Sequence, residues 1–270
     1  MKKVIITGTQ GFIGSNLKNE LQSKFQIIEI NEDIFEHQNW KYRVEEIFEQ
    51  DIEACFHVGA CSNTLETNVN YMMLVNYEFT KFLSNLCLYN RVPMIYSSSA
   101  ANYGINGEFP SNLYGWSKYV AEDYVLSNGQ IPLRYFNVYG PGEEHKGIMA
   151  SVAYQMFVKN KKSEMIKLFP KKPLRDFVYV KDIISANIYA LENYDNLSGS
   201  YYEVGSGEAR AFEDVLDLMN ISYEYQPESV IPKGYQFYTC SDKSKWMRGW
   251  TSKWNLEVGM KDYLNYLNNN

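Results

Sequence analysis

The fold is decided by the stretch Val4-Ile5-Ile6-Thr7-Gly8-Thr9-Gln10-Gly11-Phe12-Ile13-Gly14. A β-branched run leads into glycines spaced three residues apart, and apolar residues recur at positions 13, 17 and 21. This order predicts a buried strand, a glycine turn and an amphipathic helix. Glycines permit a tight turn and let a pyrophosphate approach the amides at the start of the helix. The spacing is not the frequent G-x-G-x-x-G, and a glycine turn can serve packing alone, but between a strand and a helix it predicts dinucleotide binding.

Strands and helices alternate outward from this turn through the first half of the chain. Further strands are predicted at 27–30, 54–58, 92–97 and 132–136, and helices at about 69–90 and 115–127. Such alternation is typical of an α/β fold, here a Rossmann-type doubly wound parallel sheet. The gap between Ile30 and Glu53 barely holds a full crossover and a further strand. We therefore expect a strand or a helix to be short or missing there.

The second half of the chain predicts a smaller α/β domain interleaved with the first. Elements are predicted as a helix near 149–157, a strand at 176–180, a helix at 181–194, a strand at 201–204 and helices near 211–219 and 257–267. The helix at 181–194 is expected to return to the main sheet. We therefore expect a dinucleotide-binding Rossmann domain and a substrate-binding domain, made respectively of 1–136 with about 176–196 and of about 137–175 with 197–270.

The composition restricts the class of protein. The 270 residues include 26 Lys and Arg against 32 Asp and Glu, a net charge of −6 that lacks the basic footprint of a nucleic-acid-binding protein. Charged residues at 21% and apolar residues at 45% indicate a globular fold rather than disorder. The four cysteines and three histidines form no metal-ligand pattern. Because no apolar run reaches the length of a membrane span or signal-peptide core, we expect a cytoplasmic protein with reduced thiols, no metal and no membrane partner.

A second motif, Tyr114-Gly115-Trp116-Ser117-Lys118, carries candidate chemistry. Four residues apart on a helix, the phenol and the ammonium share one face. A free tyrosine has a pKa of about 10, too high for a base at neutral pH, and a nearby cation lowers it. Such a pair is common by chance, but Ser97-Ser98-Ser99 ends a strand shortly before it. The motif and Ser99 together indicate acid–base chemistry at a substrate oxygen.

These motifs resemble the extended short-chain dehydrogenase/reductase superfamily, whose members mostly act on nucleotide sugars. A closer resemblance, to the ADP-L-glycero-D-manno-heptose 6-epimerase family, covers nearly the whole chain. Its most specific segment is His145-Lys146-Gly147-x-Met149-Ala150-Ser151, which generic nucleotide-sugar epimerases lack. The others are His57-x-Gly59-Ala60-Cys61-Ser62, Tyr71-Met72-Met73, Ser98-Ser99-Ala100-Ala101-x-Tyr103-Gly104, Arg134-Tyr135-Phe136-Asn137-Val138-Tyr139-Gly140-Pro141 and Arg175-Asp176-Phe177-Val178-Tyr179-Val180.

The resemblance implies an NAD(P)-dependent isomerase that inverts C6 of an ADP-heptose with no net redox change. A bound nicotinamide takes hydride from C6, giving a transient 6-ketone, and returns it to the other face. Proton transfer is needed on both sides of the sugar, and the resemblance assigns it to Tyr114 and Lys146. It also implies that Lys118 holds the nicotinamide ribose and lowers the pKa of Tyr114, while Ser99 orients the oxygen. Without the resemblance, Lys146 is interpreted as a solvated loop lysine, since a lysine base needs a lowered pKa.

Further site residues follow from the resemblance, position by position. For the cofactor they are Gly8, Gly11, Phe12, Ile13, Gly14, Asn31, Asp33, Ile34, Val58, Gly59, Ala60, Ser62, Asn76, Tyr114, Lys118 and Val138. For the substrate they are Ser99, Asn137, Ile148, Gln155, Phe169, Arg175 and Tyr235. Arg175 suits a diphosphate because its guanidinium is planar and permanently charged, and an ion pair with Asp176 is the alternative.

Three departures from the family pattern leave the substrate open. Ile148 stands where the family has a substrate-contacting serine, Gln155 stands where it has a substrate-contacting histidine, and the segment from Phe169 to Arg175 is shorter. The alternatives are another nucleotide-sugar epimerase or reductase of the superfamily, or a non-catalytic dinucleotide-binding protein. The sequence does not distinguish lipopolysaccharide, capsule or another glycan as the destination of the heptose. By analogy with the family we expect a homo-oligomer.

The cofactor is predicted to be NADP or NAD. Asn31 stands where an acidic residue would clasp the ribose hydroxyls of NAD, so a 2′-phosphate is tolerated, and the resemblance favours NADP. The next residues, Glu32 and Asp33, are acidic, and no basic residue follows before Lys41, which favours NAD. We place NADP slightly ahead on the strength of the resemblance. Asp33 and Ile34 alternatively cap the adenine, as an Asp-aliphatic pair does in related folds.

Overall fold

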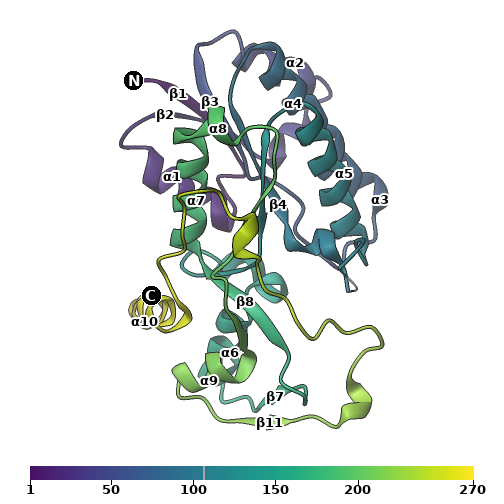
Figure 1. The fold of residues 1–270 in the computed structure, drawn as a ribbon, viewed down its shortest axis with the longest axis vertical. Helices are drawn as coiled ribbons and strands as arrows, with labels where there is room; N and C mark the ends of the chain where they lie inside the picture. The colour runs from purple at the N-terminus through teal and green to yellow at the C-terminus, as the bar shows by residue number, and fades with distance from the viewer. Residues whose placement is uncertain (106) are drawn as a thin grey trace. The chain divides into compact units, whose positions relative to one another are not determined.

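A computed structural model describes residues 1–105 and 107–270 of the chain (Figure 1). The chain forms two compact units, each assembled from two stretches of sequence. The first unit contains Met1–Arg134 and Ile184–Tyr202, and the second contains Tyr135–Ile183 and Glu203–Asn270.

The first unit is built on a six-stranded sheet with the order β2-β1-β3-β4-β5-β9. Its strands are β1 (Lys3–Thr7), β2 (Gln26–Ile30), β3 (Ile52–His57), β4 (Met94–Ser99), β5 (Ile131–Tyr135) and β9 (Tyr202–Val204). Strand β1 pairs in parallel with β2 and β3, and β3 pairs in parallel with β4. The connections are the helices α1 (Phe12–Leu21), α2 (Trp40–Ile47), α4 (Phe79–Tyr89) and α5 (Leu113–Ser127). The predicted doubly wound α/β fold is confirmed.

The shortened part of this sheet lies at its β2 edge. The strands β2-β1-β3-β4-β5 follow the doubly wound order 3-2-1-4-5-6 without its outermost strand, and β9 adds a further strand at the opposite edge. Between β2 and β3 the chain forms only the 3-10 turn Glu32–Glu36 and the eight-residue helix α2. Val44 of α2 is fully buried in the core beside Ile30, so the short helix still covers the sheet. The expected missing element is therefore an edge strand.

The helix predicted over 69–90 is continuous but not uniform. It consists of α3 (Val69–Met73), a π-helical turn (Leu74–Glu78) and α4. The π turn holds Asn76, whose side chain accepts a hydrogen bond from Cys61 N–H at 2.8 Å and donates to Ser117 Oγ at 2.9 Å. Such bulges occur frequently at functional sites, and this one buries a predicted cofactor residue.

The second unit contains two small sheets and three longer helices. One sheet has the order β10-β8-β6, and the other pairs β11 with β7. The strands are β6 (Asn137–Tyr139), β7 (Ile166–Leu168), β8 (Leu174–Tyr179), β10 (Ala209–Ala211) and β11 (Tyr223–Tyr225), and the helices are α6 (Val152–Lys161), α9 (Phe212–Leu218) and α10 (Leu256–Asn269). Tyr139, Tyr179 and Tyr263 are almost fully buried and form an aromatic core.

One strand lies outside the domain in which the sequence placed it. Strand β8, expected in the dinucleotide-binding domain, pairs with β6 and β10 of the second unit. Strand β9 joins the edge of the six-stranded sheet, while its residues Glu203 and Val204 belong to the second unit. Aromatic and β-branched residues such as Phe177, Val178 and Tyr179 predict a strand but do not identify its pairing partner. Helix α7 (Val180–Glu192) crosses the boundary between the units, and α8 (Tyr194–Leu197) follows it.

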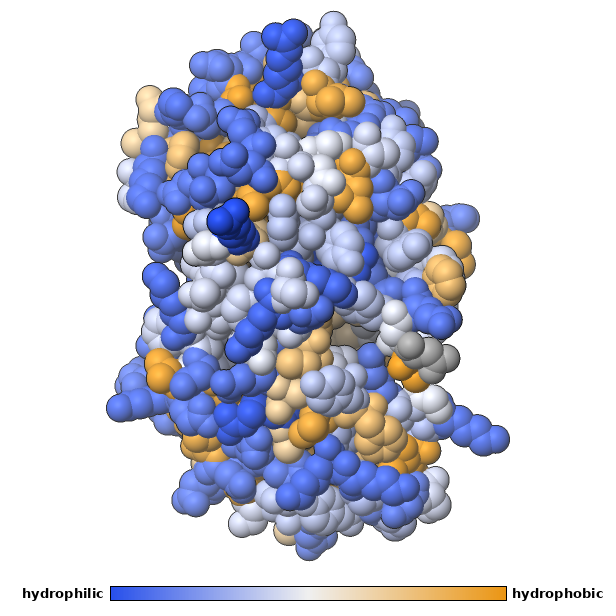
Figure 2. Space-filling view, viewed as in Figure 1, coloured by the Kyte–Doolittle hydropathy of each residue, from blue (hydrophilic) through white to orange (hydrophobic). Residues whose placement is uncertain are grey.

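The face of the molecule shown in Figure 2 is mostly polar, with apolar side chains in small groups. Among the exposed aromatic side chains, Phe109 and Trp116 of the first unit stack with ring centroids 6.1 Å apart. In the part of the chain that the structure describes, no helix has both the length and the apolar character needed to cross a membrane.

Candidate active site

The glycine turn of the first unit is shaped by close backbone approach. Gly8 has a φ of +69°, and a Cβ there would lie 2.5 Å from the Cα of Gly59. A Cβ on Gly14 would lie 2.0 Å from the carbonyl oxygen of Gly8. Gly11 occupies the N-cap of the ten-residue helix α1, and no side chain caps that end. The helix N-terminus therefore offers backbone amides and dipole to a phosphate group, which fits the predicted dinucleotide.

Acidic side chains surround the end of β2, where the adenosine ribose of a dinucleotide is expected. The Asn31 side-chain oxygen accepts hydrogen bonds from Gln10 N–H at 3.3 Å and from the Thr9 hydroxyl at 3.1 Å. Glu29 forms an ion pair with Lys18 at 2.7 Å, which helps to lower the pKa of Glu29. Glu32 accepts a hydrogen bond from the Tyr71 hydroxyl. Lys18, the basic residue beside these acidic side chains, is thus already engaged in an ion pair with Glu29.

The remaining cofactor candidates of this unit differ in exposure. Ile34 is half-buried and packs against the core, while Asp33 is exposed. Val58, Gly59 and Ala60 are half-buried after β3, and Ser62 is exposed. Phe12 is buried and Ile13 is half-buried at the start of α1.

Ser99, Tyr114 and Lys118 occupy adjoining elements of the first unit. Ser99 ends β4, and its side chain forms a hydrogen bond with Tyr114 on α5. Helix α5 is capped by Asn112, which accepts a hydrogen bond from Gly115 N–H at 2.8 Å. Lys118 is 2% exposed, and its Nζ lies 4.2 Å from the centroid of the Tyr96 ring. The predicted grouping of serine, tyrosine and lysine is therefore present in the fold.

Burial dominates the electrostatics of Tyr114 and Lys118. Burial raises the pKa of Tyr114, and the hydrogen bond from Ser99 only partly opposes that rise. Burial also lowers the pKa of Lys118, to about 7. The cause is desolvation, which disfavours the charged form of both groups. The role of Lys118 in lowering the pKa of Tyr114 stays a prediction for the enzyme with its cofactor bound.

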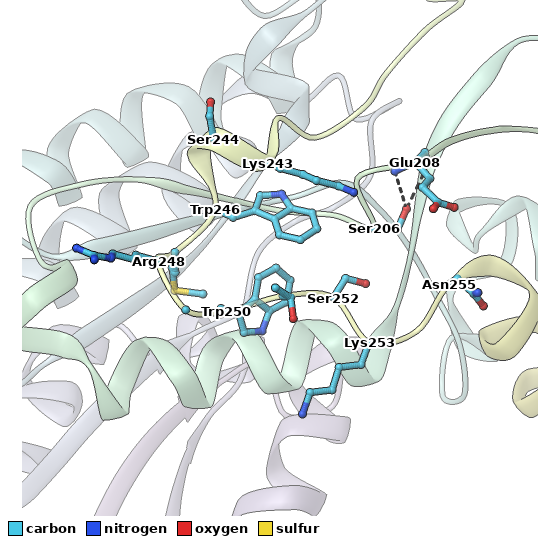
Figure 3. A pocket seen from close by; sticks show the side chains of 13 residues that line it. Ser206, Glu208, Lys243, Ser244, Trp246, Arg248, Trp250, Ser252, Lys253 and Asn255 are labelled. Carbon is cyan, nitrogen blue, oxygen red and sulfur yellow. Dashed lines mark hydrogen bonds between the residues drawn. The ribbon is translucent and has the colours of Figure 1, made fainter.

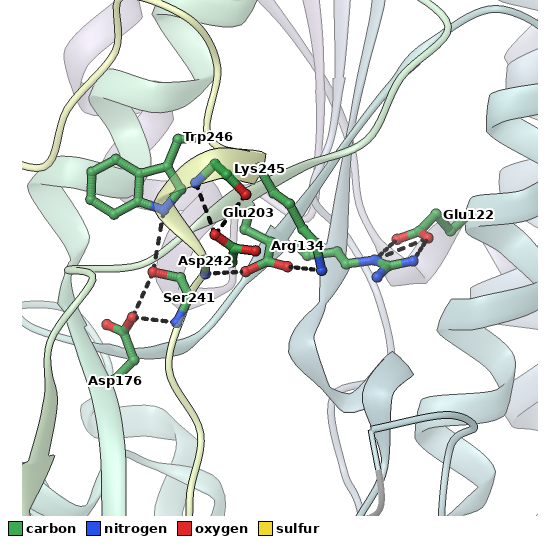
Figure 4. A network of polar contacts seen from close by, with 9 residues as sticks. Glu122, Arg134, Asp176, Glu203, Ser241, Asp242, Lys245 and Trp246 are labelled. Atoms are coloured by element: carbon green, nitrogen blue, oxygen red, sulfur yellow. Dashed lines mark hydrogen bonds and ion pairs between the residues drawn. The ribbon is translucent and has the colours of Figure 1, made fainter.

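A buried ion pair that the sequence analysis missed supports this face of α5. Glu122, one turn beyond Lys118, pairs with Arg134 of β5 at 2.5 Å (Figure 4). Glu122 also accepts hydrogen bonds from Ser98 Oγ at 2.5 Å and Asn102 Nδ2 at 3.0 Å. The pair therefore ties α5 to the end of β4, beside Ser99. The regular spacing of Tyr114, Lys118 and Glu122 was the available signal.

Lys146 lies in the second unit, on the irregular 3-10 segment Glu144–Met149. Its side chain is half-buried, and burial lowers its pKa while Glu143 opposes the shift. A solvated loop lysine does not have these properties. Ile148 is 75% exposed, whereas the Gln155 amide donates to the carbonyls of Ile148 at 3.1 Å and Ala150 at 2.8 Å.

Three of the predicted substrate residues form a cluster in the second unit. The guanidinium of Arg175 donates to the carbonyls of Leu174 at 2.9 Å and Gln236 at 2.6 Å, and lies 5.5 Å from the Tyr235 ring. Phe169 meets Tyr235 edge-on, with centroids 5.0 Å apart. Burial lowers the pKa of Arg175.

Asn137, a predicted substrate residue, and Val138, a predicted cofactor residue, both lie on β6. Val138 is half-buried, and Asn137 is exposed with its Oδ1 3.5 Å from the Thr239 hydroxyl. This strand pairs in parallel with β8, so Asn137 lies opposite Phe177.

The hydrogen bonds of Asp176 decide whether it forms an ion pair with Arg175. This carboxylate is fully buried and accepts hydrogen bonds from Ser241 N–H at 2.8 Å and from the Ser241 hydroxyl at 2.7 Å (Figure 4). It also accepts hydrogen bonds from Ser206 N–H at 2.6 Å and from the Ser206 hydroxyl at 2.7 Å. Within residues 1–105 and 107–270, no carboxylate lies within ion-pair distance of Arg175. An Arg175–Asp176 ion pair is therefore not formed, and the guanidinium charge is available to an anion.

A separate pocket of about 610 Å³ opens in the second unit (Figure 3). Trp246 and Trp250 line it with ring centroids 5.2 Å apart, and Lys243 and Lys253 lie at its border. None of the predicted site residues is among its lining residues. The candidate active site is therefore not this pocket.

Known proteins resemble this chain along its whole length. Residues 4–205 match the NAD dependent epimerase/dehydratase family. The ADP-L-glycero-D-manno-heptose-6-epimerase of Brachyspira hyodysenteriae is 34% identical over 313 aligned positions, covering 98% of this chain and 97% of that protein. The crystal structure of the Helicobacter pylori ADP-L-glycero-D-manno-heptose-6-epimerase matches with a TM-score of 0.85 and 28% identity, covering 99% and 96% of the two chains. The dTDP-glucose 4,6-dehydratase of Bacillus anthracis, solved with NAD, shares the fold at a TM-score of 0.80 and 19% identity, covering 100% and 97%.

The fold and these matches define the class of the protein as a nicotinamide-dependent epimerase of nucleotide sugars. The chain belongs to the NAD dependent epimerase/dehydratase family and, within it, to the ADP-L-glycero-D-manno-heptose 6-epimerases. A nicotinamide dinucleotide is accordingly the cofactor class. The predicted family and enzyme class are confirmed.

Proposed function

We propose that this chain converts ADP-D-glycero-D-manno-heptose to ADP-L-glycero-D-manno-heptose by inverting C6. The observation that supports this most is the Ser99–Tyr114 hydrogen bond with Lys118 one turn further, in the unit that carries the glycine turn. The names of the two heptose epimerase relatives support the choice of substrate.

The two proton-transfer groups have environments that favour opposite roles. When bound, a nicotinamide dinucleotide supplies the hydride acceptor and donor for this chemistry. Because burial lowers the pKa of Lys146, this amine is the better base for the C6 hydroxyl proton. Because burial raises the pKa of Tyr114, the phenol keeps its proton and serves as the acid toward the C6 oxygen when hydride returns. Ser99 donates to the same oxygen and holds it in place.

Arg175 is the proposed anchor for the diphosphate. Its guanidinium is fixed by two backbone carbonyls and faces the ring of Tyr235, so its orientation is set before an anion arrives. Phe169 and Tyr235 offer ring edges and faces beside it for the rest of the nucleotide sugar. Asn137 is exposed on β6 and adds a polar contact. We expect Ile148 and the free carbonyl of the Gln155 amide to contact the sugar.

The activity is tested with ADP-D-glycero-D-manno-heptose in deuterated water, following the configuration at C6 by NMR. We expect the L-glycero epimer to appear without deuterium at C6, because hydride returns from the cofactor rather than from solvent. Tyr114→Phe and Lys146→Met are expected to lose turnover, while Lys243→Met, in the separate pocket, keeps it. No turnover by protein shown to carry its cofactor would exclude this substrate. Deuterium at C6 would exclude the hydride mechanism.

For the cofactor we propose NAD ahead of NADP, against the initial preference drawn from the resemblance. The residues that follow Asn31 are acidic, and the Glu32 carboxylate is held in place by Tyr71. A 2′-phosphate there would meet negative charge, and Lys18 is engaged with Glu29. Titration of the cofactor-free protein with each dinucleotide, followed by calorimetry, tests this. Tighter binding of NADP than of NAD would contradict the proposal, and Glu32→Gln should narrow the difference.

A second candidate function is epimerisation of a different nucleotide sugar. It is favoured by Ile148, an exposed apolar side chain two residues beyond Lys146, and by the Gln155 amide group, which is engaged with the loop backbone. Cofactor reduction during incubation with a panel of nucleotide sugars discriminates the two functions. Homo-oligomer formation and a cytoplasmic location stay predictions, the first tested by light scattering of the purified chain.

A further inference from the structure

One buried carboxylate joins the two ends of the loop that carries Lys146. Glu143 is 0% exposed. Its Oε1 accepts hydrogen bonds from Gly140 N–H at 3.1 Å and from the Ser151 hydroxyl at 2.7 Å, and its Oε2 accepts one from Ser151 N–H. Because Ser151 is also the N-cap of α6, the loop is tied to a regular helix at that end. A side chain thus closes the loop from Gly140 to Ser151.

The same carboxylate connects the loop to the core of the second unit. The Tyr263 hydroxyl of α10 donates to Glu143 Oε1 at 2.9 Å, and Tyr263 is itself fully buried. Within the loop, Lys146 N–H donates to the Glu143 carbonyl at 3.0 Å. The backbone of Lys146 is therefore one short turn away from a residue held by four donors.

We propose that Glu143 is a positioning residue that closes this loop and places the Lys146 side chain for proton transfer. Gln155 completes the support, because its amide holds the carbonyls of Ile148 and Ala150 on the far side of Lys146. The inference rests on the proposed function for the role of Lys146. A misplaced proton-transfer group costs about 10- to 100-fold in rate, so the loss is expected in kcat rather than in the KM of the nucleotide sugar.

Charge gives this arrangement a second consequence. Burial raises the pKa of Glu143, and its four hydrogen-bond donors oppose that rise, as expected for a carboxylate that only accepts. The groups that face this cluster are Glu144 of the loop, Tyr154 of α6, and Tyr263 and Tyr266 of α10. The negative charge of Glu143 raises the pKa of Lys146 against the effect of burial. Removing that charge should therefore lower the pKa of Lys146 further.

The test compares Glu143→Gln with two matched variants of the full chain. Asp182→Asn changes another buried carboxylate of the second unit, one that accepts hydrogen bonds from Ser252 Oγ at 2.6 Å and Trp254 N–H at 3.0 Å, away from the loop. Ser151→Ala removes one donor but keeps the charge of Glu143. The readouts are kcat, KM, and the pKa of Lys146 from NMR of ¹³C-methylated lysines, with the signal assigned by its loss in Lys146→Arg.

We expect Glu143→Gln to lower the pKa of Lys146 and to reduce kcat by about 10- to 100-fold with little change in KM. Ser151→Ala is expected to reduce kcat without the pKa change, which keeps the proposal testable if Glu143→Gln does not fold. A Lys146 pKa and kcat in Glu143→Gln equal to those of Asp182→Asn would overturn it. If the wild-type chain does not turn over ADP-heptose, the proposed function fails, while the pKa comparison still decides the role of Glu143.

Discussion

Replacing Arg134 by Met is expected to destabilise the first unit by about 3–5 kcal/mol, because it leaves Glu122 buried without its charge partner. The exposed fractions are 7% for Arg134 and 2% for Glu122, so water does not replace the lost contacts. Met fills a similar volume without donors, which limits the change to the loss of the ion pair.

The magnitude follows from the contacts. Arg134 donates from two N–H groups to the Glu122 carboxylate: Nε–H is shared between the two oxygens at 3.1 and 2.9 Å, and Nη2–H donates to Oε1 at 2.5 Å. Hydrogen bonds to charged groups contribute about 1.5–3 kcal/mol each, and the desolvated carboxylate adds its own penalty. Ser98 and Asn102 continue to donate to Glu122 in the variant. The loss in the free energy of unfolding therefore stays well below the summed energies of the Arg134 hydrogen bonds and the full desolvation penalty. Arg134 also lies 3.7 Å from the Tyr201 ring centroid, a contact that Met retains in part.

Urea unfolding of the cofactor-free chain, followed by tryptophan fluorescence, measures the free energy of unfolding. The double variant Glu122→Gln/Arg134→Met should recover more than half of the loss, because the buried charge is gone. Lys2→Met serves as the control, since its ion pair with Glu53 at 2.6 Å is exposed and should be worth less than about 1 kcal/mol. A loss below about 1 kcal/mol in Arg134→Met, or a double variant no more stable than the single one, would refute this reasoning.

Three further predictions concern the cofactor and substrate residues. Lys118 has its pKa lowered from 10.5 to about 7, so the unfolded chain binds more protons between these values, and stability of the cofactor-free chain should rise from pH 7 to pH 10. Lys118→Met should remove this dependence of stability on pH. It should also raise the free energy of unfolding at pH 7, measured in urea, by at most about 5 kcal/mol. Gly14→Ala should abolish dinucleotide binding by calorimetry, because its Cβ would lie 2.0 Å from the Gly8 carbonyl; binding at wild-type affinity would show that the turn adapts. Arg175→Met should raise KM for the nucleotide sugar by about 10- to 100-fold, consistent with loss of a charged hydrogen bond, and leave dinucleotide affinity unchanged; an unaltered KM would place the diphosphate elsewhere.

Periodicity and glycine spacing predicted the elements of the first unit because those signals are local. The run Val4-Ile5-Ile6 is fully buried as expected, and the short interval after Ile30 does lack an edge strand. Pairing is not local. Strand β8 contains Phe177, Val178 and Tyr179, residue types typical of any strand, yet its partners are β6 and β10, and only the three-dimensional fold reveals them.

The chemistry of the site residues likewise has a part that the sequence predicts and a part that depends on the fold. Motif spacing located Tyr114 and Lys118 on one helix, but the direction of the Tyr114 pKa depends on burial, which spacing does not report. The charge of Lys118 is directed toward the Tyr96 ring, and desolvation acts on lysine and tyrosine alike.

Gln155 is a position where a different side chain makes a different contact and still supports the site. The sequence comparison with the family suggests a lost substrate contact, since an amide replaces an imidazole. In the fold, the amide nitrogen donates to the carbonyls of Ile148 and Ala150, and so it holds the backbone just beyond Lys146. An imidazole has no second N–H in its neutral form and cannot donate to both carbonyls. If Gln155 supports the loop in this way, Gln155→His should lower kcat through Lys146 before it alters the affinity for the sugar.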